Sequence, residues 1–215
     1  SINPDNYFIL SGKPCASKIT KVDGDSKPDE SVDIAFIAEG YTFNEMDKFR
    51  NDVKRMAKYF LSSPHFDKYE DKFNIWAVEA ISEESGTDIP GEMIYKKTAL
   101  NSSYYTFDVA RYLTTTDIKS VYDYAANVPY DQVYVLINSE RYGGGGIYNH
   151  YSASTSDHEL TPNVLVHEFG HGFAGLADEY YSSAVAYEDF YPLDIEPWEP
   201  NITTLVDFDS KWTDI

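Results

Sequence analysis

Two histidines and a glutamate lie in a fixed register towards the C-terminal end of the chain. His167 and His171 are four residues apart, and Glu168 follows the first of them. On an α-helix, side chains four residues apart project from one face about one turn apart. That separation suits two imidazole ligands of a tetrahedral Zn²⁺. Glu168 would lie beside the metal, where a carboxylate can take a proton from water and later deliver it to a leaving amine. The pattern therefore predicts zinc-assisted hydrolysis.

A catalytic zinc needs a third protein ligand and an open position. Gly172 and Gly175 weaken the helix and allow the chain to turn back, and two carboxylates, Asp178 and Glu179, follow at once. We expect Asp178 to be the third metal ligand, with Glu179 as the alternative. The carboxylate that does not bind the metal could instead orient a ligating histidine.

Other candidates flank this segment. Tyr180 could donate a hydrogen bond to the oxyanion of a tetrahedral intermediate, and Tyr181 could do the same. Ordinary packing is the alternative for both, because the chain has 19 tyrosines. His150 and His158 could supply a ligand from elsewhere or assist the chemistry, and are otherwise polar surface residues.

The helix that must carry these residues has clear start signals. Thr161 is expected as the N-cap, with Pro162 at the first helical position and the helix running to Ala174. The apolar residues 164–166 are typical of a helix that crosses a core. The alternative is a surface helix that carries His and Glu by coincidence, but two of only five histidines occupy this register.

Four consecutive glycines, Gly143 to Gly146, precede the helix. A phosphate-binding loop is disfavoured because no Lys-Ser/Thr follows. A flexible loop and the rim of a cleft are the two remaining interpretations, since glycine permits close approach of a ligand. Residues 147–154 alternate in polarity and predict an exposed edge strand, which could pair with an extended peptide. Gly144, Gly145 and Tyr148 are therefore the candidate substrate-binding residues.

The rest of the chain predicts an α/β layered domain. Strands are expected over 31–38, 73–81 and 133–137, the last one buried on both faces. A helix over 42–62 should begin at a capping box of Thr42 and Glu45, and 106–126 should be helical in two pieces. Alternating strands and helices indicate an α/β fold. Residues 1–30 are polar and turn-rich, which favours an extended lead-in or linker from an upstream module, followed by a catalytic domain over 31–215.

Composition excludes some partners. The chain has 215 residues, with 36 acidic against 17 basic side chains and a net charge of −19. This charge argues against nucleic acid and anionic membranes as partners. It serves solubility or provides sites for Ca²⁺, a second candidate cofactor. Cys15 is the only cysteine, so an internal disulfide is impossible, and no run is long enough to span a membrane. The start of the chain has no signal-peptide pattern, so a signal would already have been removed in an exported protein.

Residues 167–180 resemble the bacterial immunoglobulin A peptidase family of zinc metallopeptidases. Further similarity lies in 33–42, 73–78 and 84–88. The resemblance implies a metzincin-like three-layer α/β/α catalytic domain with a mixed sheet and an active-site helix below a cleft. It also implies a protein or peptide substrate and a secreted, periplasmic or cell-surface location in a bacterium. We expect a monomer.

The segment departs from the common metzincin pattern in two ways. The glycine turn and the acidic residue fall one position later, which leaves Asp178 and Glu179 as alternatives. No methionine follows the helix, since the three are Met46, Met56 and Met93. The methionine turn beneath the metal is therefore absent from these residues, so either the chain continues past Ile215 or the zinc is supported differently.

Three functions fit the sequence. The first is a zinc-dependent endopeptidase of extracellular polypeptides. The second is a catalytically weak or inactive zinc-containing module that binds host glycoprotein or glycan. The third is a zinc hydrolase acting on a non-peptide bond.

Overall fold

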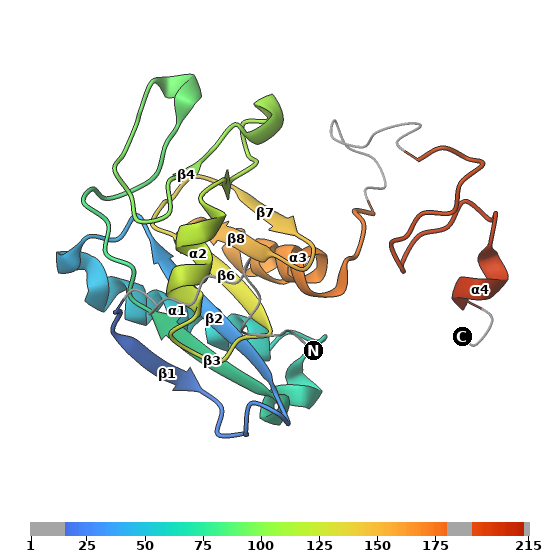
Figure 1. Cartoon of the computed structure of the whole chain (residues 1–215), viewed down its shortest axis with the longest axis horizontal. Coiled ribbons are helices and arrows are strands. Elements are labelled where there is room, and N and C mark those ends of the chain that lie inside the picture. The colour runs from blue at the N-terminus through green and yellow to red at the C-terminus, as the bar shows by residue number, and fades with distance from the viewer. Residues whose placement is uncertain (1–15, 180–190, 213–215) are drawn as a thin grey trace, which may run out of the picture.

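The computed structural model describes residues 16–179 and 191–212, and in it a six-stranded mixed sheet organises the chain (Figure 1). The strand order is β1-β3-β2-β6-β8-β7. The four inner strands are parallel to one another, and both edge strands are antiparallel to their neighbours. The strands are β1 (Ile19–Asp23), β2 (Val32–Glu39), β3 (Phe73–Val78), β6 (Gln132–Ile137), β7 (Gly144–Ile147) and β8 (Tyr151–Thr155), and the short β4 (Ser102–Ser103) and β5 (Thr114–Thr115) form a separate pair.

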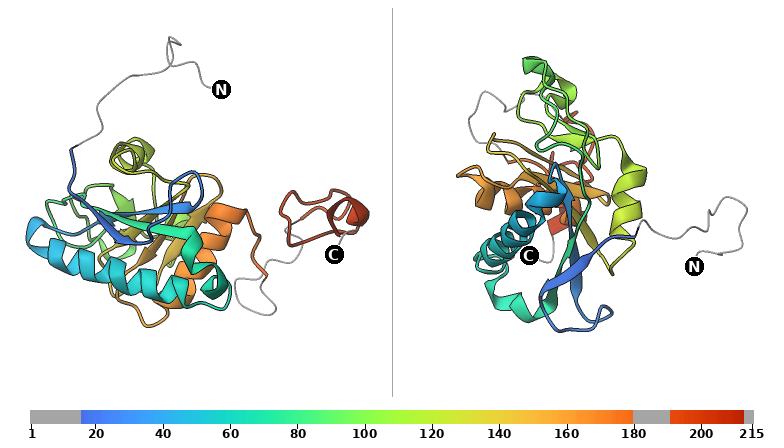
Figure 2. Two further views of the ribbon diagram at one scale, coloured as in Figure 1. Left: turned by 90° about the horizontal axis from the view of Figure 1, so that it is seen from below. Right: turned by 90° about the vertical axis from the view of Figure 1, so that its left-hand side faces the viewer.

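Helices cover both faces of the sheet. Helices α1 (Met46–Leu61) and α3 (Thr161–Ala174) lie on one face, and α2 (Ile118–Ala125) lies on the other (Figure 2). The fourth helix, α4 (Phe208–Trp212), follows in the C-terminal segment. The expected α/β fold with a mixed sheet is confirmed. Short 3₁₀ turns complete the described elements: η1 (Phe43–Glu45), η2 (Asp67–Lys72), η3 (Pro90–Glu92) and η4 (Thr106–Asp108).

The central strands and α1 form where the sequence predicts them. Every residue of β6 is buried, as expected of a parallel strand covered on both faces. Helix α1 buries an apolar stripe at three- and four-residue spacing, including Phe49, Val53 and Phe60. The expected capping box of Thr42 and Glu45 is present at the turn η1 that leads into α1, where the Glu45 carboxylate accepts a hydrogen bond from the Thr42 backbone N–H at 2.9 Å.

The segment 106–126 is helical only in its second piece, α2. The first piece is the single turn η4, in which Phe107 and Asp108 have φ values of 55° and 60°. The reason is tertiary pairing: Gly144 N–H donates to Arg111 O at 3.2 Å, and Leu113 N–H donates to Gly144 O at 3.0 Å. These bonds hold 111–113 extended along the sheet edge, so the prediction of a helix there is wrong.

The edge strand also differs from expectation. Residues 147–154 do not form an exposed edge, because β8 pairs in parallel with β6 and all five of its residues are buried. The glycine run supplies the edge instead, as β7. The prediction failed because β8 is built from small residues such as Ser152 and Ala153. They lack the large apolar side chains that usually mark a buried strand, but their size lets α3 pack closely over them.

Residues 19–23 differ from the expected lead-in. They form β1, which pairs with β3 and so belongs to the sheet. The position of the domain boundary itself stays a prediction.

Candidate metal centre

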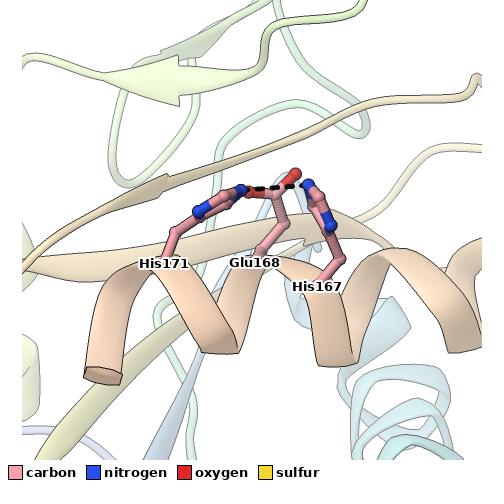
Figure 3. A group of neighbouring side chains, drawn as sticks. All are labelled: His167, Glu168 and His171. Atoms are coloured by element: carbon pink, nitrogen blue, oxygen red, sulfur yellow. Dashed lines mark hydrogen bonds between the residues drawn. The ribbon is translucent and has the colours of Figure 1, made fainter. Parts of the chain in front are cut away.

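Helix α3 is anchored by its apolar side and presents polar side chains on the other. Leu165 and Phe169 are buried in the core, and the Phe169 ring lies 4.8 Å from that of Phe60 in α1. His167 and His171 point outward together with Glu168 between them (Figure 3). The two imidazole Nε2 atoms are 3.0 Å apart. The helical register therefore brings both histidines to one point, as their spacing predicts.

The end of α3 returns a carboxylate to the same point. Gly175 is left-handed, with φ of 65°, and its N–H donates to His171 O at 3.1 Å. The chain reverses there, and Asp178 Oδ1 comes to lie 3.0 Å from His167 Nε2 and 3.1 Å from His171 Nε2. Three potential ligand atoms thus form a small triangle.

This triangle fits a zinc ion closely. Tetrahedral ligands about 2.1 Å from zinc lie roughly 3.4 Å from one another. The observed separations of 3.0 and 3.1 Å need to widen by only a few tenths of an ångström. Two imidazoles and a carboxylate are also a donor set that zinc accepts.

The neighbouring carboxylate is engaged elsewhere. Glu179 Oε1 accepts a hydrogen bond from Asn201 Nδ2 at 2.7 Å. The Glu179 carboxylate thus faces Asn201, whereas Asp178 Oδ1 lies against the two histidines, and the choice of Asp178 as third ligand stays a prediction.

Hydrogen bonding sets the tautomer of His171. Its Nδ1 lies 2.5 Å from Leu176 O, which can only accept, so Nδ1 carries a hydrogen and Nε2 faces the centre. The hydrogen bond with Asp178 raises the pKa of His171 to about 9. Burial acts to raise the pKa of Asp178, but hydrogen bonds from His167 and His171 outweigh it and lower that pKa. In the metal-free protein His171 is therefore protonated and bonded to the Asp178 carboxylate, and a metal ion would have to displace that proton to bind.

Glu168 has the properties of a group that exchanges protons near neutral pH. Burial raises its pKa to about 7, while the charges of His167 and His171 act in the opposite direction. Its ligand atom lies within 4.8 Å of those of both histidines. A carboxyl group with such a pKa can both accept and release a proton at neutral pH.

The glycine strand forms the wall beside Glu168. A Cβ on Gly144 would lie 2.8 Å from Glu168 Oε1, and one on Gly146 would lie 2.7 Å from His171 Cβ. Only glycine lets β7 approach the helix this closely. The glycines expected as a loop or rim are therefore an edge strand packed against the polar face of α3.

Comparison with known proteins places this arrangement in a family. The family model described as IgA Peptidase M64 matches residues 21–215. The chain belongs to this family. A comparison with curated proteins found no match. The IgA Peptidase M64 family is a metallopeptidase family, and the His-Glu-His group agrees with that membership.

Other residues predicted for the site have different surroundings in this M64 chain. Tyr148 is half-exposed and its ring lies 5.1 Å from Trp198. His150 contacts the Tyr122 hydroxyl, and His158 accepts the Leu160 N–H at 3.2 Å, so neither joins the triangle of potential ligand atoms. Tyr180 and Tyr181 lie outside the described residues.

The start of α3 corrects one prediction. Leu160, not Thr161, is the N-cap, and Thr161 is the first helical residue. Thr161 is buried, and its Oγ1 has no hydrogen-bond partner among the described residues. The connection from β8 enters the helix one residue earlier than the Thr-Pro signal indicates.

Sequence reasoning missed Asn201, Trp198 and Arg111. The positive charge of Arg111 opposes the larger effect of burial, which raises the pKa of Glu168. No motif or spacing marks any of the three, because the fold brings them to the helix from distant parts of the chain.

Proposed function

We propose that this chain is a zinc-dependent endopeptidase that hydrolyses peptide bonds of extracellular polypeptides. The observation that carries the proposal is the convergence of His167 Nε2, His171 Nε2 and Asp178 Oδ1 within 3.1 Å of one another. Glu168 lies beside them with a pKa raised to about 7 by burial. Membership of a metallopeptidase family supports the same reaction.

Each residue has a distinct role in the proposed reaction. His167, His171 and Asp178 would hold the zinc, which when bound supplies Lewis acidity and lowers the pKa of water. Glu168 takes the proton from the attacking water and delivers it to the leaving amine. The Nδ1 hydrogen bond of His171 to Leu176 O keeps its Nε2 directed at the centre. Tyr180 stays a candidate for stabilising the oxyanion.

The edge of β7 favours an extended polypeptide as substrate. The outward backbone groups of Gly144 are bonded to Arg111 and Leu113, and Gly146 is the next residue of β7 whose backbone groups face away from β8. An extended segment that pairs with this edge would run past Glu168. A strand edge can accept the middle of a chain, which favours an endopeptidase. Gly144, which is already paired, would act through its close packing on the helix.

The remaining expectations complete the proposal. The enzyme would act as a monomer, secreted, periplasmic or at the surface of a bacterium, with the catalytic domain over residues 31–215. No helix among the described residues is long and apolar enough to cross a membrane. Calcium as a second cofactor stays a prediction.

Replacing the glutamate tests the mechanism. Glu168→Ala should bind zinc like the wild type but lose at least ~100-fold in turnover of casein, the scale of acid–base catalysis. The matched control is Glu159→Ala, which removes an exposed carboxylate just before α3 and should keep full activity. Full activity in Glu168→Ala would exclude this mechanism. Bound zinc without cleavage of casein or immunoglobulin by the wild type would favour the glycoprotein- or glycan-binding module.

A further inference from the structure

The side chain of Asn201 makes a two-way pair with the backbone directly before Asp178. Ala177 N–H donates to Asn201 Oδ1 at 2.8 Å, and Asn201 Nδ2 donates to Ala177 O at 3.0 Å. The same Nδ2 donates to Glu179 Oε1 at 2.7 Å. One amide thus bonds the residues on both sides of Asp178, from 24 positions along the chain.

Helix α3 supports the turn that follows it as far as Leu176, whose N–H donates to Gly170 O at 3.2 Å and whose carbonyl accepts from His171 Nδ1 at 2.5 Å. Regular helix ends at Ala174, and residues 175–179 belong to no helix or strand. The Asp178 side chain is 37% exposed, so packing alone does not fix it. Its position against the two histidines therefore depends on the backbone on either side of it.

The loop before α4, which carries Asn201, also packs on this turn through Trp198. The Trp198 ring lies 5.1 Å from that of Tyr148, and it occupies the space where a Cβ on Gly175 would fall, 2.9 Å away. Trp198 therefore lies against the turn that reverses the chain, while Asn201 bonds the irregular segment that follows the turn.

This loop is itself braced from within. Lys211 Nζ donates to Glu199 O and to Ile202 O, each at 2.9 Å, and it pairs with Glu196 Oε1 at 3.1 Å. The Lys211 side chain is only 15% exposed. Lys211 thus bonds backbone carbonyls on both sides of Asn201, which restrains the backbone that carries the Asn201 side chain.

We propose that Asn201 is a positioning residue that holds Asp178 in place as a metal ligand. The proposal rests on the metal site proposed above and adds the group that preorganises its third ligand. Asn201 does not touch the metal or the substrate. It acts by fixing the backbone at Ala177 and the side chain of Glu179, so that the Asp178 carboxylate faces the histidines rather than solvent.

Metal affinity is the direct test. Asn201→Ala in the full chain should bind zinc about 10- to 100-fold more weakly in a chelator competition, the usual effect of losing a partner of a metal ligand. The Co²⁺-loaded variant should have a d–d absorption spectrum that resembles that of Asp178→Ala rather than that of the wild type, because the carboxylate no longer coordinates. A purely structural role would leave the spectrum unchanged. The melting temperature of the chelated protein shows whether each variant is folded.

A pair of substitutions provides the rescue. Asn201→Asp keeps the acceptor for Ala177 N–H but places a carboxylate against Glu179, so it should also weaken zinc binding. Adding Glu179→Gln supplies an amide that can donate to the carboxylate introduced at position 201, and it should recover most of the affinity. The matched control is Asn127→Ala, which removes an amide bonded to the Asp123 and Tyr124 carbonyls in α2 and should leave zinc affinity unchanged.

The outcomes separate this inference from the function it rests on. If His171→Ala binds zinc as tightly as the wild type, the metal site itself is wrong. If His171→Ala loses zinc while Asn201→Ala binds it within about twofold of the wild type, with an unchanged cobalt spectrum, the positioning role is wrong. If Asn201→Ala does not fold, equal affinities of Asn201→Asp and the double variant would overturn the role.

Discussion

Two glycines of α3 lie two residues apart and have opposite surroundings. A Cβ on Gly170 would meet only Leu176 Cδ1, at 3.4 Å. A Cβ on Gly172 would lie 2.2 Å from Ser152 Oγ and 2.6 Å from Gln132 Nε2. Ser152 is buried and its Oγ donates to Glu168 O at 2.7 Å, so it cannot move aside freely. Gly172 is thus needed for packing beneath the site, whereas Gly170 is not.

Alanine at these two positions should have effects of opposite sign. Gly170→Ala should raise the free energy of unfolding by about 0.5–1 kcal/mol, because alanine costs less backbone entropy in a helix. Gly172→Ala should lower it by about 1–3 kcal/mol through overpacking. Urea unfolding of both variants measures the two changes. Equal effects would show that helix propensity, not space beneath the helix, governs both positions.

The chemistry-bearing residues were predictable where one local period carries them. His167, Glu168 and His171 share a helix face, so spacing alone places them together. The glycine turn after the helix predicts that the chain reverses and brings Asp178 back towards the histidines. Asn201 was not predictable, because its partners lie 22 and 24 positions away and no local pattern records a tertiary hydrogen bond.

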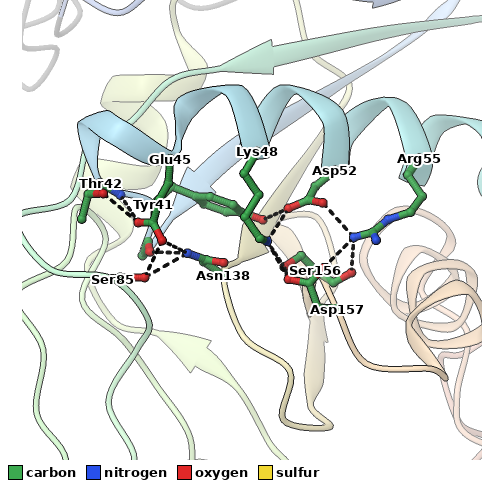
Figure 4. A network of polar contacts seen from close by, with 11 residues as sticks. Tyr41, Thr42, Glu45, Lys48, Asp52, Arg55, Ser85, Asn138, Ser156 and Asp157 are labelled. Atoms are coloured by element: carbon green, nitrogen blue, oxygen red, sulfur yellow. Dashed lines mark hydrogen bonds and ion pairs between the residues drawn. The ribbon is translucent and has the colours of Figure 1, made fainter.

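At the scale of elements, α1 is tied to the connection that leads from β8 into α3 (Figure 4). Asp157 accepts from Lys48 Nζ at 2.6 Å and from Arg55 at 2.8 Å. Both cations also bond Asp52, whose carboxylate accepts from the buried Tyr41 hydroxyl. The entry to α3 is therefore held against α1 by ion pairs.

This connection should make stability depend on pH in the acid range. Burial acts to raise the pKa of Asp157, but hydrogen bonds from Lys48 and Arg55 outweigh it and lower that pKa. An acid with a lowered pKa in the folded state stabilises the fold above its unfolded value, near 4, and loses that contribution as the pH falls. Asp157→Asn should thus cost about 1 kcal/mol at pH 7.

The difference between Asp157→Asn and the wild type should shrink as the pH falls below about 4. Urea unfolding at pH 7 and at pH 3 measures it. The exposed Asp71, which pairs with Lys72 at 3.6 Å, provides the control, and Asp71→Asn should change little at either pH. A constant difference across this range would exclude ionisation of Asp157 as its cause.

Elements were predictable where burial and period agree. Strands β2, β3 and β6 and helix α1 have strong apolar patterns and form as expected. The helix expected before α2 and the edge expected over 147–154 failed for one reason. Backbone hydrogen bonds of β7 hold 111–113 extended and cover the edge of β8. Glycines have no side-chain pattern from which this pairing could be predicted.

At the scale of the whole molecule, the proposed metal site joins two parts of the chain. His167 and His171 belong to the helix packed on the sheet, whereas Asp178 is held from the C-terminal segment through Asn201. A metal bound by all three would bind the folded arrangement and not the unfolded chain. Its binding free energy would therefore add to the stability of the fold.

Chelation should lower the melting temperature of the zinc-loaded protein. At a free zinc concentration 100 times the Kd, the expected stabilisation is about 2.7 kcal/mol. Thermal unfolding across a zinc titration measures it, and His171→Ala should melt at one temperature throughout. If the melting temperature of the wild type does not change with zinc concentration, the proposed metal site is wrong.

The glycine strand has a consequence for the fluctuations of this fold. Glycine loses more conformational freedom on folding than any other residue, so ordering β7 costs more entropy than ordering an average strand of its length. The strand has almost no side chains with which to offset that cost, and it depends on backbone bonds to β8 and 111–113 and on contact with α3. Local opening of the sheet should therefore be easy at β7. The wall beside Glu168 would then be able to part from its neighbours while the core stays folded.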